Sequence, residues 1–177
     1  MQDLFTDNRL KSSLTIALLV LSSILVAAKT SIFFSPFPGI IPDELTYMNQ
    51  AFFPDPEKQT YGNALHASIY SIADSCGAAW YQCAKGLNLL FELTGSLALS
   101  TAVFVKTRSY LRTAATFLLT FGGPFLMYGT FFMPESLHAG LIYLFVAGYI
   151  LSSGRLLGVT LASVFLGLAA LAKPHAL

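Results

Sequence analysis

The chain has 177 residues, of which 55% are hydrophobic and 11% are charged, and its formal net charge is +1. A soluble domain needs more polar surface than this, so the composition excludes an ordinary water-soluble globular protein. Nothing in the near-neutral charge indicates nucleic-acid binding, and we expect no nucleic-acid partner.

Several largely apolar stretches predict an all-α, polytopic membrane protein with about five transmembrane helices. Most of them approach the ~20 residues that a spanning helix needs. The second stretch reaches this length only if it begins near Gly86 and takes Glu92 into the membrane. The helices are expected near residues 12–33, 86–105, 113–133, 136–154 and 156–172, with an outside loop at residues 34–85.

The basic residues predict the orientation. If the N-terminus is cytoplasmic, most of them fall on the inside and most of the acids fall on the outside, which is the positive-inside pattern. We therefore expect a multi-pass protein of the cytoplasmic (inner) membrane. The inside set comprises Arg9, Lys11, Lys106, Arg108, Arg112 and Arg155.

The outside loop opens its first short helix at Pro42, followed by Asp43 and Glu44. Proline suits the first turn of a helix, and acids are favourable at its positive N-terminal end. The apolar residues that follow recur at helical spacing, so we expect an amphipathic helix on the membrane surface. A second short helix is expected near residues 64–73. Asp43 and Glu44 either cap the first helix or take part in chemistry.

A further acid, Glu135, lies in the second outside loop, the short turn between the third and fourth predicted helices. Carboxylates are costly near a bilayer, so acids in two loops on the same side indicate a site. His138 follows Glu135 by one helical turn. This spacing also occurs in di-metal sites, but those need further glutamates that are not visible here, so a packing or hydrogen-bonding role is favoured.

Glu92 lies inside the second predicted helix, where an acid is a functional candidate by default. It has an alternative interpretation, because Lys85 or Lys29 could lie nearby and neutralise it. We favour this structural interpretation.

Cys76 and Cys83 both lie on the side predicted to be oxidising. On one regular helix they would be ~10 Å apart, which is too far for a disulfide. A break at Gly77 would allow a bond, so both the bonded and the free state stay open.

The order of these motifs resembles the N-terminal half of a GT-C-type membrane glycosyltransferase, similar to protein O-mannosyltransferases and lipid A aminoarabinose transferases. The resemblance covers nearly the whole chain and implies the N-terminal part of a longer enzyme. Such enzymes transfer a sugar from a polyprenyl-phosphate-linked donor to a lipid, glycan or protein acceptor on the outer face of the cytoplasmic membrane. The matching residues are Asp43-Glu44-Leu45-Thr46-Tyr47, Lys85-Gly86-Leu87-Asn88, Pro134-Glu135 and Leu171-Ala172-Lys173-Pro174.

The resemblance implies catalytic roles for three acids. Asp43 would be the general base that deprotonates the acceptor hydroxyl, Glu44 would orient the acceptor or a metal, and Glu135 would supply the acid of the second loop. The chemistry asks for these types, because an attacking hydroxyl needs a carboxylate within about 3 Å. The three acids also offer hard oxygen ligands for Mg²⁺ or Mn²⁺. Relatives differ in using a metal, so this requirement stays open.

Three further residues are expected to bind substrate. Lys173, after the fifth helix, matches the basic residue that would meet the carrier phosphate, and Lys85 is a weaker candidate for the same phosphate. His138 is the third, through its position beside Glu135. A phosphate leaving group needs cations or a metal to take its charge.

Two other functions are weighed against the enzyme. A transporter or flippase subunit would use Glu92, Lys29 and Glu135 to line a polar path, but it should show broken helices or inverted repeats at matched positions. Gly122-Gly123-Pro124 interrupts the third helix without a counterpart elsewhere. An inactive structural partner, which uses the fold for assembly only, is the other alternative.

Overall fold

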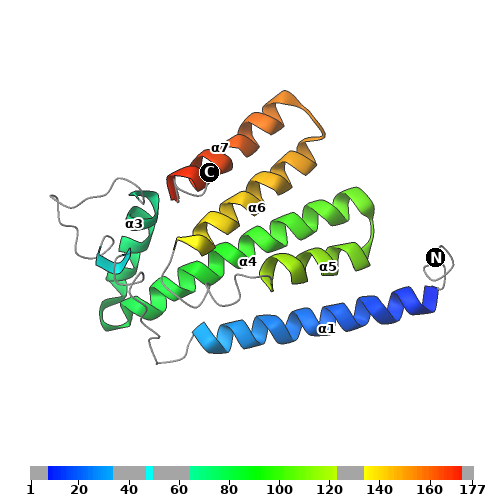
Figure 1. Cartoon of the computed structure of the whole chain (residues 1–177), viewed down its shortest axis with the longest axis horizontal. Coiled ribbons are helices and arrows are strands. Elements are labelled where there is room, and N and C mark those ends of the chain that lie inside the picture. The colour runs from blue at the N-terminus through cyan, green and yellow to red at the C-terminus, as the bar shows by residue number, and fades with distance from the viewer. Residues whose placement is uncertain (1–7, 34–46, 50–63, 123–133, 173–177) are drawn as a thin grey trace.

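The computed structural model describes residues 8–33, 47–49, 64–122 and 134–172, and all regular structure among them is helical (Figure 1). For these residues the prediction of an all-α chain is confirmed. The elements are α1 (Asn8–Phe33), α3 (Ala64–Tyr70), the 3₁₀ helix η3 (Ser71–Ala79), α4 (Trp80–Thr107), α5 (Tyr110–Phe121), α6 (Glu135–Ser152) and α7 (Leu156–Ala172).

Three helical segments of the described chain are long and apolar enough to cross a membrane, as a multi-pass membrane protein requires. They are Leu10–Ser31, Leu65–Thr107 and Glu135–Ser152, and α7 is a shorter apolar helix. α1 shows its membrane character most clearly, because it exposes large apolar side chains such as Ile16, Val20 and Ile24. Such exposure is unfavourable in water but ordinary against lipid tails.

α4 is the central helix of the bundle (Figure 1). It packs against α6 on one side and α5 on the other, while α7 lies on α6 and α1 lies along α5. The α4–α6 contact is close because glycines face each other. A Cβ atom added at Gly95 would lie 2.7 Å from the Gly140 carbonyl oxygen, and one added at Gly140 would lie 2.6 Å from the Phe91 carbonyl oxygen. Small residues thus let the two backbones touch, as in other membrane helix pairs.

Two tight turns form the end of the bundle that we call the turn end. After α4, Arg108 adopts a left-handed conformation with φ 51°, and Ser109 then caps α5 by accepting a hydrogen bond of 3.4 Å from the Arg112 backbone N–H. After α6, Ser153 and Gly154 have φ 52° and 79°. These left-handed residues reverse the chain at once, so α4–α5 and α6–α7 are antiparallel hairpins.

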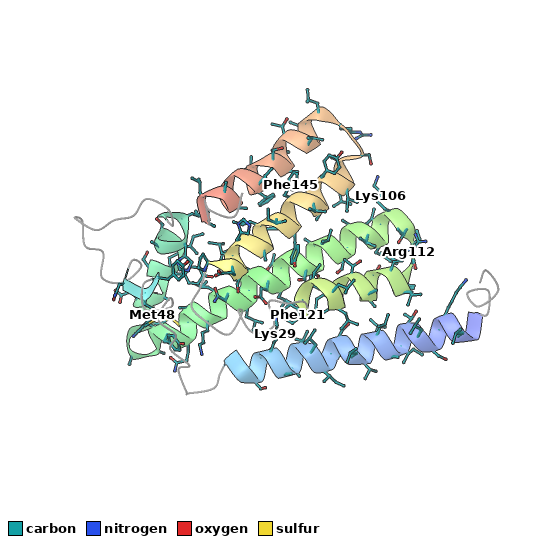
Figure 2. The ribbon with its side chains drawn as sticks, in the orientation of Figure 1. Lys29, Met48, Lys106, Arg112, Phe121 and Phe145 are labelled. Atoms are coloured by element: carbon teal, nitrogen blue, oxygen red, sulfur yellow. A yellow bond between two sulfur atoms is a disulfide. The ribbon has the colours of Figure 1, made fainter. Side chains whose placement is uncertain are left out.

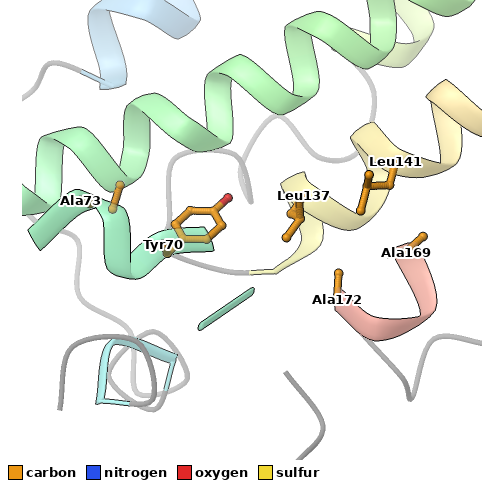
Figure 3. Close-up of a cluster of buried hydrophobic side chains, with 7 residues drawn as sticks. Tyr70, Ala73, Leu137, Leu141, Ala169 and Ala172 are labelled. Carbon is orange, nitrogen blue, oxygen red and sulfur yellow. The ribbon is translucent and has the colours of Figure 1, made fainter. Parts of the chain in front are cut away.

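The opposite end, called here the α3 end, holds the main apolar core (Figure 3). Here α3 and η3 pack across the first part of α4, the start of α6 and the end of α7. Tyr70 fills much of this core and is fully buried. The buried members of the core are Tyr70, Ala73, Ala84, Leu137, Leu141, Ala169 and Ala172.

A disulfide closes the connection between η3 and α4. Gly77 has φ 58° and ψ −126°, which breaks the helical path, and Cys76 and Cys83 are bonded with their Cα atoms 6.6 Å apart. Positive φ costs glycine little, so the break falls where the sequence allows it. Of the two states that the sequence left open, the structure has the bonded one.

Several helix ends differ from the expected ranges. α1 and α5 begin a few residues early, at Asn8 and Tyr110. α4 begins at Trp80, ahead of the expected start at Gly86, because the chain re-enters a helix directly after the Gly77 break. α5 ends at Phe121 with Gly122 at its C-cap, and the later part of the expected helix, residues 123–133, lies outside the described residues.

Candidate functional site

A buried ion pair joins α1 to α4. The Lys29 ammonium donates to Oε2 of Glu92 at 2.5 Å, and both side chains are almost completely buried. The other carboxylate oxygen, Oε1, accepts a hydrogen bond of 2.7 Å from the Ser136 hydroxyl of α6. We call these three residues the Lys29–Glu92–Ser136 cluster. The structure selects Lys29 rather than Lys85 as the partner of Glu92.

The Lys29 ammonium also lies over an aromatic ring. Its nitrogen is 4.4 Å from the centroid of Phe121, the last residue of α5 (Figure 2). A cation over an aromatic face is attracted by the ring quadrupole, most strongly where water is absent. The ammonium is therefore held between a carboxylate and a ring, which offsets part of the cost of burying it.

Glu92 also belongs to a stripe of buried polar residues along α4. The residues of this stripe recur every three or four positions, so they share one face of the helix. Tyr70 of α3 donates its hydroxyl to Oδ1 of Asn88, which links the stripe to the core at the α3 end. The stripe consists of Lys85, Asn88, Glu92, Ser96 and Ser100.

Aromatic side chains lie around the first residues of this stripe, Lys85 and Asn88, at the α3 end. His66 stacks on Tyr70 with ring centroids 4.3 Å apart and meets Tyr47 edge-on at 5.6 Å. Lys85 is only 4% exposed, and its ammonium lies 4.5 Å from the centroid of Tyr81. Its predicted contact with a carrier phosphate is not tested by this arrangement and stays a prediction.

Glu135 and His138 lie at the start of α6, one turn apart. Glu135 is the first residue of the helix and is half-buried, while its neighbour Ser136 reaches Glu92. His138 Nδ1 lies 2.9 Å from the Ala169 carbonyl oxygen of α7, so this side chain joins α6 to α7. The hydrogen bond matches the structural role that the sequence favoured. A contact of His138 with substrate stays a prediction.

The remaining predicted residues, Asp43, Glu44 and Lys173, lie outside the described residues. Within the described part of the chain, no group of three or more His, Cys, Asp or Glu side chains could hold a metal ion. The metal prediction depends on Asp43 and Glu44, so it is not tested.

Sequence reasoning assigned no role to several members of this site, among them Asn88 and Ser136. A signal for Asn88 was present, because Lys85, Asn88 and Glu92 fall on one helical face of an otherwise apolar segment. Polar residues of a membrane helix face the bundle interior, so this spacing could have predicted the buried stripe. Ser136 had no comparable signal beyond its place beside Glu135.

Both carboxylate oxygens of Glu92 are already engaged within the cluster. Each oxygen of Glu92 already accepts from a donor on another helix, and the group is shielded from solvent. A carboxylate held in this way ties helices together and is poorly placed to accept a proton from a substrate.

Comparisons of this chain with protein-family models, with curated proteins and with solved structures found no match.

Proposed function

We propose that this chain is the N-terminal part of a GT-C-type glycosyltransferase and contains its catalytic acids. Such an enzyme transfers a sugar from a polyprenyl-phosphate-linked donor to a lipid, glycan or protein acceptor. One observation carries the proposal: the Lys29–Glu92–Ser136 cluster ties the last turns of α1 to the first turn of α6. α1 leads into the segment with Asp43 and Glu44, and Ser136 follows Glu135 directly. The tie thus brings the end of the helix that precedes Asp43 and Glu44 in the sequence beside the start of the helix that begins at Glu135.

In this proposal α5 and α7 complete a bundle of five spans, with the N-terminus in the cytoplasm. The turn end is basic. Lys106 and Arg112 flank the α4–α5 turn (Figure 2), and Arg155 lies in the α6–α7 turn. The positive-inside rule puts this end in the cytoplasm. The α3 end then faces outward, where the disulfide between Cys76 and Cys83 meets an oxidising environment.

The proposed reaction is a single displacement. The acceptor hydroxyl oxygen attacks the anomeric carbon, its proton passes to the Asp43 carboxylate, and the bond between that carbon and the carrier phosphate breaks. The bonding electron pair leaves with the polyprenyl phosphate. Lys173 is the cation assigned to the phosphate, with Lys85 as the weaker candidate, because the negative charge of the phosphate must be stabilised as it departs. Inversion at the sugar needs no enzyme nucleophile.

The geometry of Glu92 favours this proposal over the transporter. A polar path for a substrate needs ionisable groups that water or cargo can reach. Glu92 and Lys29 are 2% and 1% exposed and bond to each other. They act as a tie between helices, and among the described residues they do not line an open route.

The experiment is sugar transfer from a polyprenyl-phosphate donor in membrane vesicles that contain the chain. Asp43→Asn keeps the size of the side chain but removes the base, so transfer should fall by about 10²–10⁴-fold. Asp74→Asn is the matched control, because Asp74 is an exposed acid of η3 at the same end of the bundle. Full transfer by Asp43→Asn, with normal membrane insertion, would refute the proposed mechanism.

A further inference from the structure

Two cavities lie between α1 and the α4–α5 hairpin, and neither is lined by Glu92 or Glu135. The outer cavity, at the turn end, has a volume of about 790 Å³ and is lined by residues that include Lys11, Thr15, Ser109 and Arg112. The inner cavity, of about 590 Å³, lies further along α1. Tyr110 lines both cavities, so they adjoin at the start of α5. Each volume is in the range of ligand pockets.

The two cavities follow one face of α1. The lining residues of α1 run from Lys11 and Thr15 in the outer cavity to Leu19, Ser23 and Ala27 in the inner one, at helical spacing. At ~1.5 Å per residue, Lys11 and Ala27 are about 24 Å apart along the helix axis. This length exceeds half of the ~30 Å hydrocarbon core of a bilayer. The groove is long enough for an extended acyl chain that enters from one leaflet.

The outer cavity is cationic and has no acidic lining residue among those described. Lys11 approaches from α1 and Arg112 from the first turn of α5, and neither has an acidic partner within the described chain. Two other basic side chains of the α4–α5 turn are engaged elsewhere: Lys106 donates to Ser153 Oγ at 2.5 Å, and Arg108 lies over the Phe104 ring. The charges that face the outer cavity are therefore complementary to a phosphate group.

The inner cavity, in contrast, is mainly apolar. Its walls are mainly aliphatic and aromatic, with Leu97, Ala114 and Phe117 opposite α1. A free phosphate would occupy only the outer cavity, and a neutral lipid would leave the two cations unmatched. An amphiphile with an anionic head and an apolar tail matches both parts of the groove.

We propose that this groove holds one anionic membrane phospholipid, with its phosphate beside Lys11 and Arg112 and one acyl chain in the inner cavity. The lipid fills the space that α1 leaves open against the α4–α5 hairpin. This site does not depend on the proposed sugar transfer. Neither cavity is lined by Glu92 or Glu135, and the two cations that bind the phosphate lie at the turn end, so failure of either proposal leaves the other intact.

The test is native mass spectrometry of the detergent-purified chain with phosphatidylglycerol or phosphatidylcholine of identical acyl chains. We expect a one-to-one adduct that favours phosphatidylglycerol. Each basic contact is worth about fivefold in affinity, so Lys11→Gln and Arg112→Gln should each lower retention by about that factor. Arg108→Gln is the matched control: it removes the same charge from the same turn but leaves the cavity lining unchanged, and it should retain the lipid.

A second variant separates a lipid from a bound head group alone. Ala27→Trp puts a large side chain into the inner cavity from an exposed position on α1 and leaves both cations in place. It should also lower phosphatidylglycerol retention. Unchanged retention by Ala27→Trp would overturn the acyl-chain assignment. Equal retention of the two lipids, or equal losses in Arg108→Gln and Arg112→Gln, would overturn the proposal as a whole.

Discussion

Replacement of Lys29 by methionine should destabilise the bundle strongly, because it leaves Glu92 buried without its cation. Lys29 Nζ and Glu92 Oε2 are 2.5 Å apart, and neither side chain reaches solvent. Removal of one partner from a buried ion pair costs about 3–5 kcal/mol, since the remaining charge keeps its desolvation penalty. Ser136→Ala should cost less, about 1.5–3 kcal/mol, because it removes only one hydrogen bond to the carboxylate.

The double variant Lys29→Met/Glu92→Met gives the sharper result. Apolar replacement of both members of a buried pair is often neutral or stabilising, so the double variant should recover most of the stability that Lys29→Met loses. The control is Lys106→Met, which removes the same type of cation from an exposed position and should change stability by less than about 1 kcal/mol.

Unfolding of these variants can be followed in detergent by the fluorescence of Trp80, the single tryptophan of the chain. Lys29→Met with wild-type stability would refute the reasoning, because a buried Glu92 cannot lose its partner without cost. A double variant as unstable as Lys29→Met would also refute it. In that case the loss would come from the missing lysine stem and its contact with the Phe121 ring, not from an unpaired charge.

Two further predictions concern packing and covalent structure. Gly140→Ala should destabilise the α4–α6 contact by about 1–3 kcal/mol, because the new Cβ would meet the Phe91 backbone. Gly86→Ala, with nothing within 4 Å of the new Cβ, should instead stabilise α4 by up to about 1 kcal/mol in the same fluorescence-detected unfolding, because alanine is favoured over glycine inside a helix. Cys76 and Cys83 should resist alkylation until a reductant is added, and Cys76→Ser should lower stability by about 2–4 kcal/mol; free thiols in the unreduced protein would contradict the bond.

The helices of this fold were largely predictable because a bilayer demands long apolar segments. The expected ranges 136–154 and 156–172 correspond closely to α6 and α7. The start of α4 was harder to predict, because hydropathy does not show that the chain becomes helical again directly after the Gly77 break. That break also decided the cysteine pairing. The ~10 Å separation holds only for one regular helix, and Gly77 removes that condition.

The sequence predicted that Glu92 has a cationic partner, but it did not predict which side chains contact it. An acid inside a membrane helix needs a partner, and the sequence offered Lys29 and Lys85 for Glu92. The choice depends on how α1 crosses α4, which the spacing of residues along one helix cannot reveal. The hydrogen bond from Ser136 depends likewise on the close α4–α6 approach. Tertiary packing, rather than local pattern, therefore selected the partners.

The central claim is that the acids of the first loop and Glu135 form one site. Cross-linking tests this claim most directly. In the proposed site, cysteines placed at Asp43 and Glu135 should be joined by a short bismaleimide in membranes. The Lys29–Glu92–Ser136 cluster holds the last turns of α1, which precede Asp43 in the sequence, against the first turn of α6, which begins at Glu135. The control pairs a cysteine at Asp43 with one at Lys106, which lies at the turn end. Preferential joining of the first pair is the predicted result. Equal or absent cross-linking in both pairs would contradict a shared site.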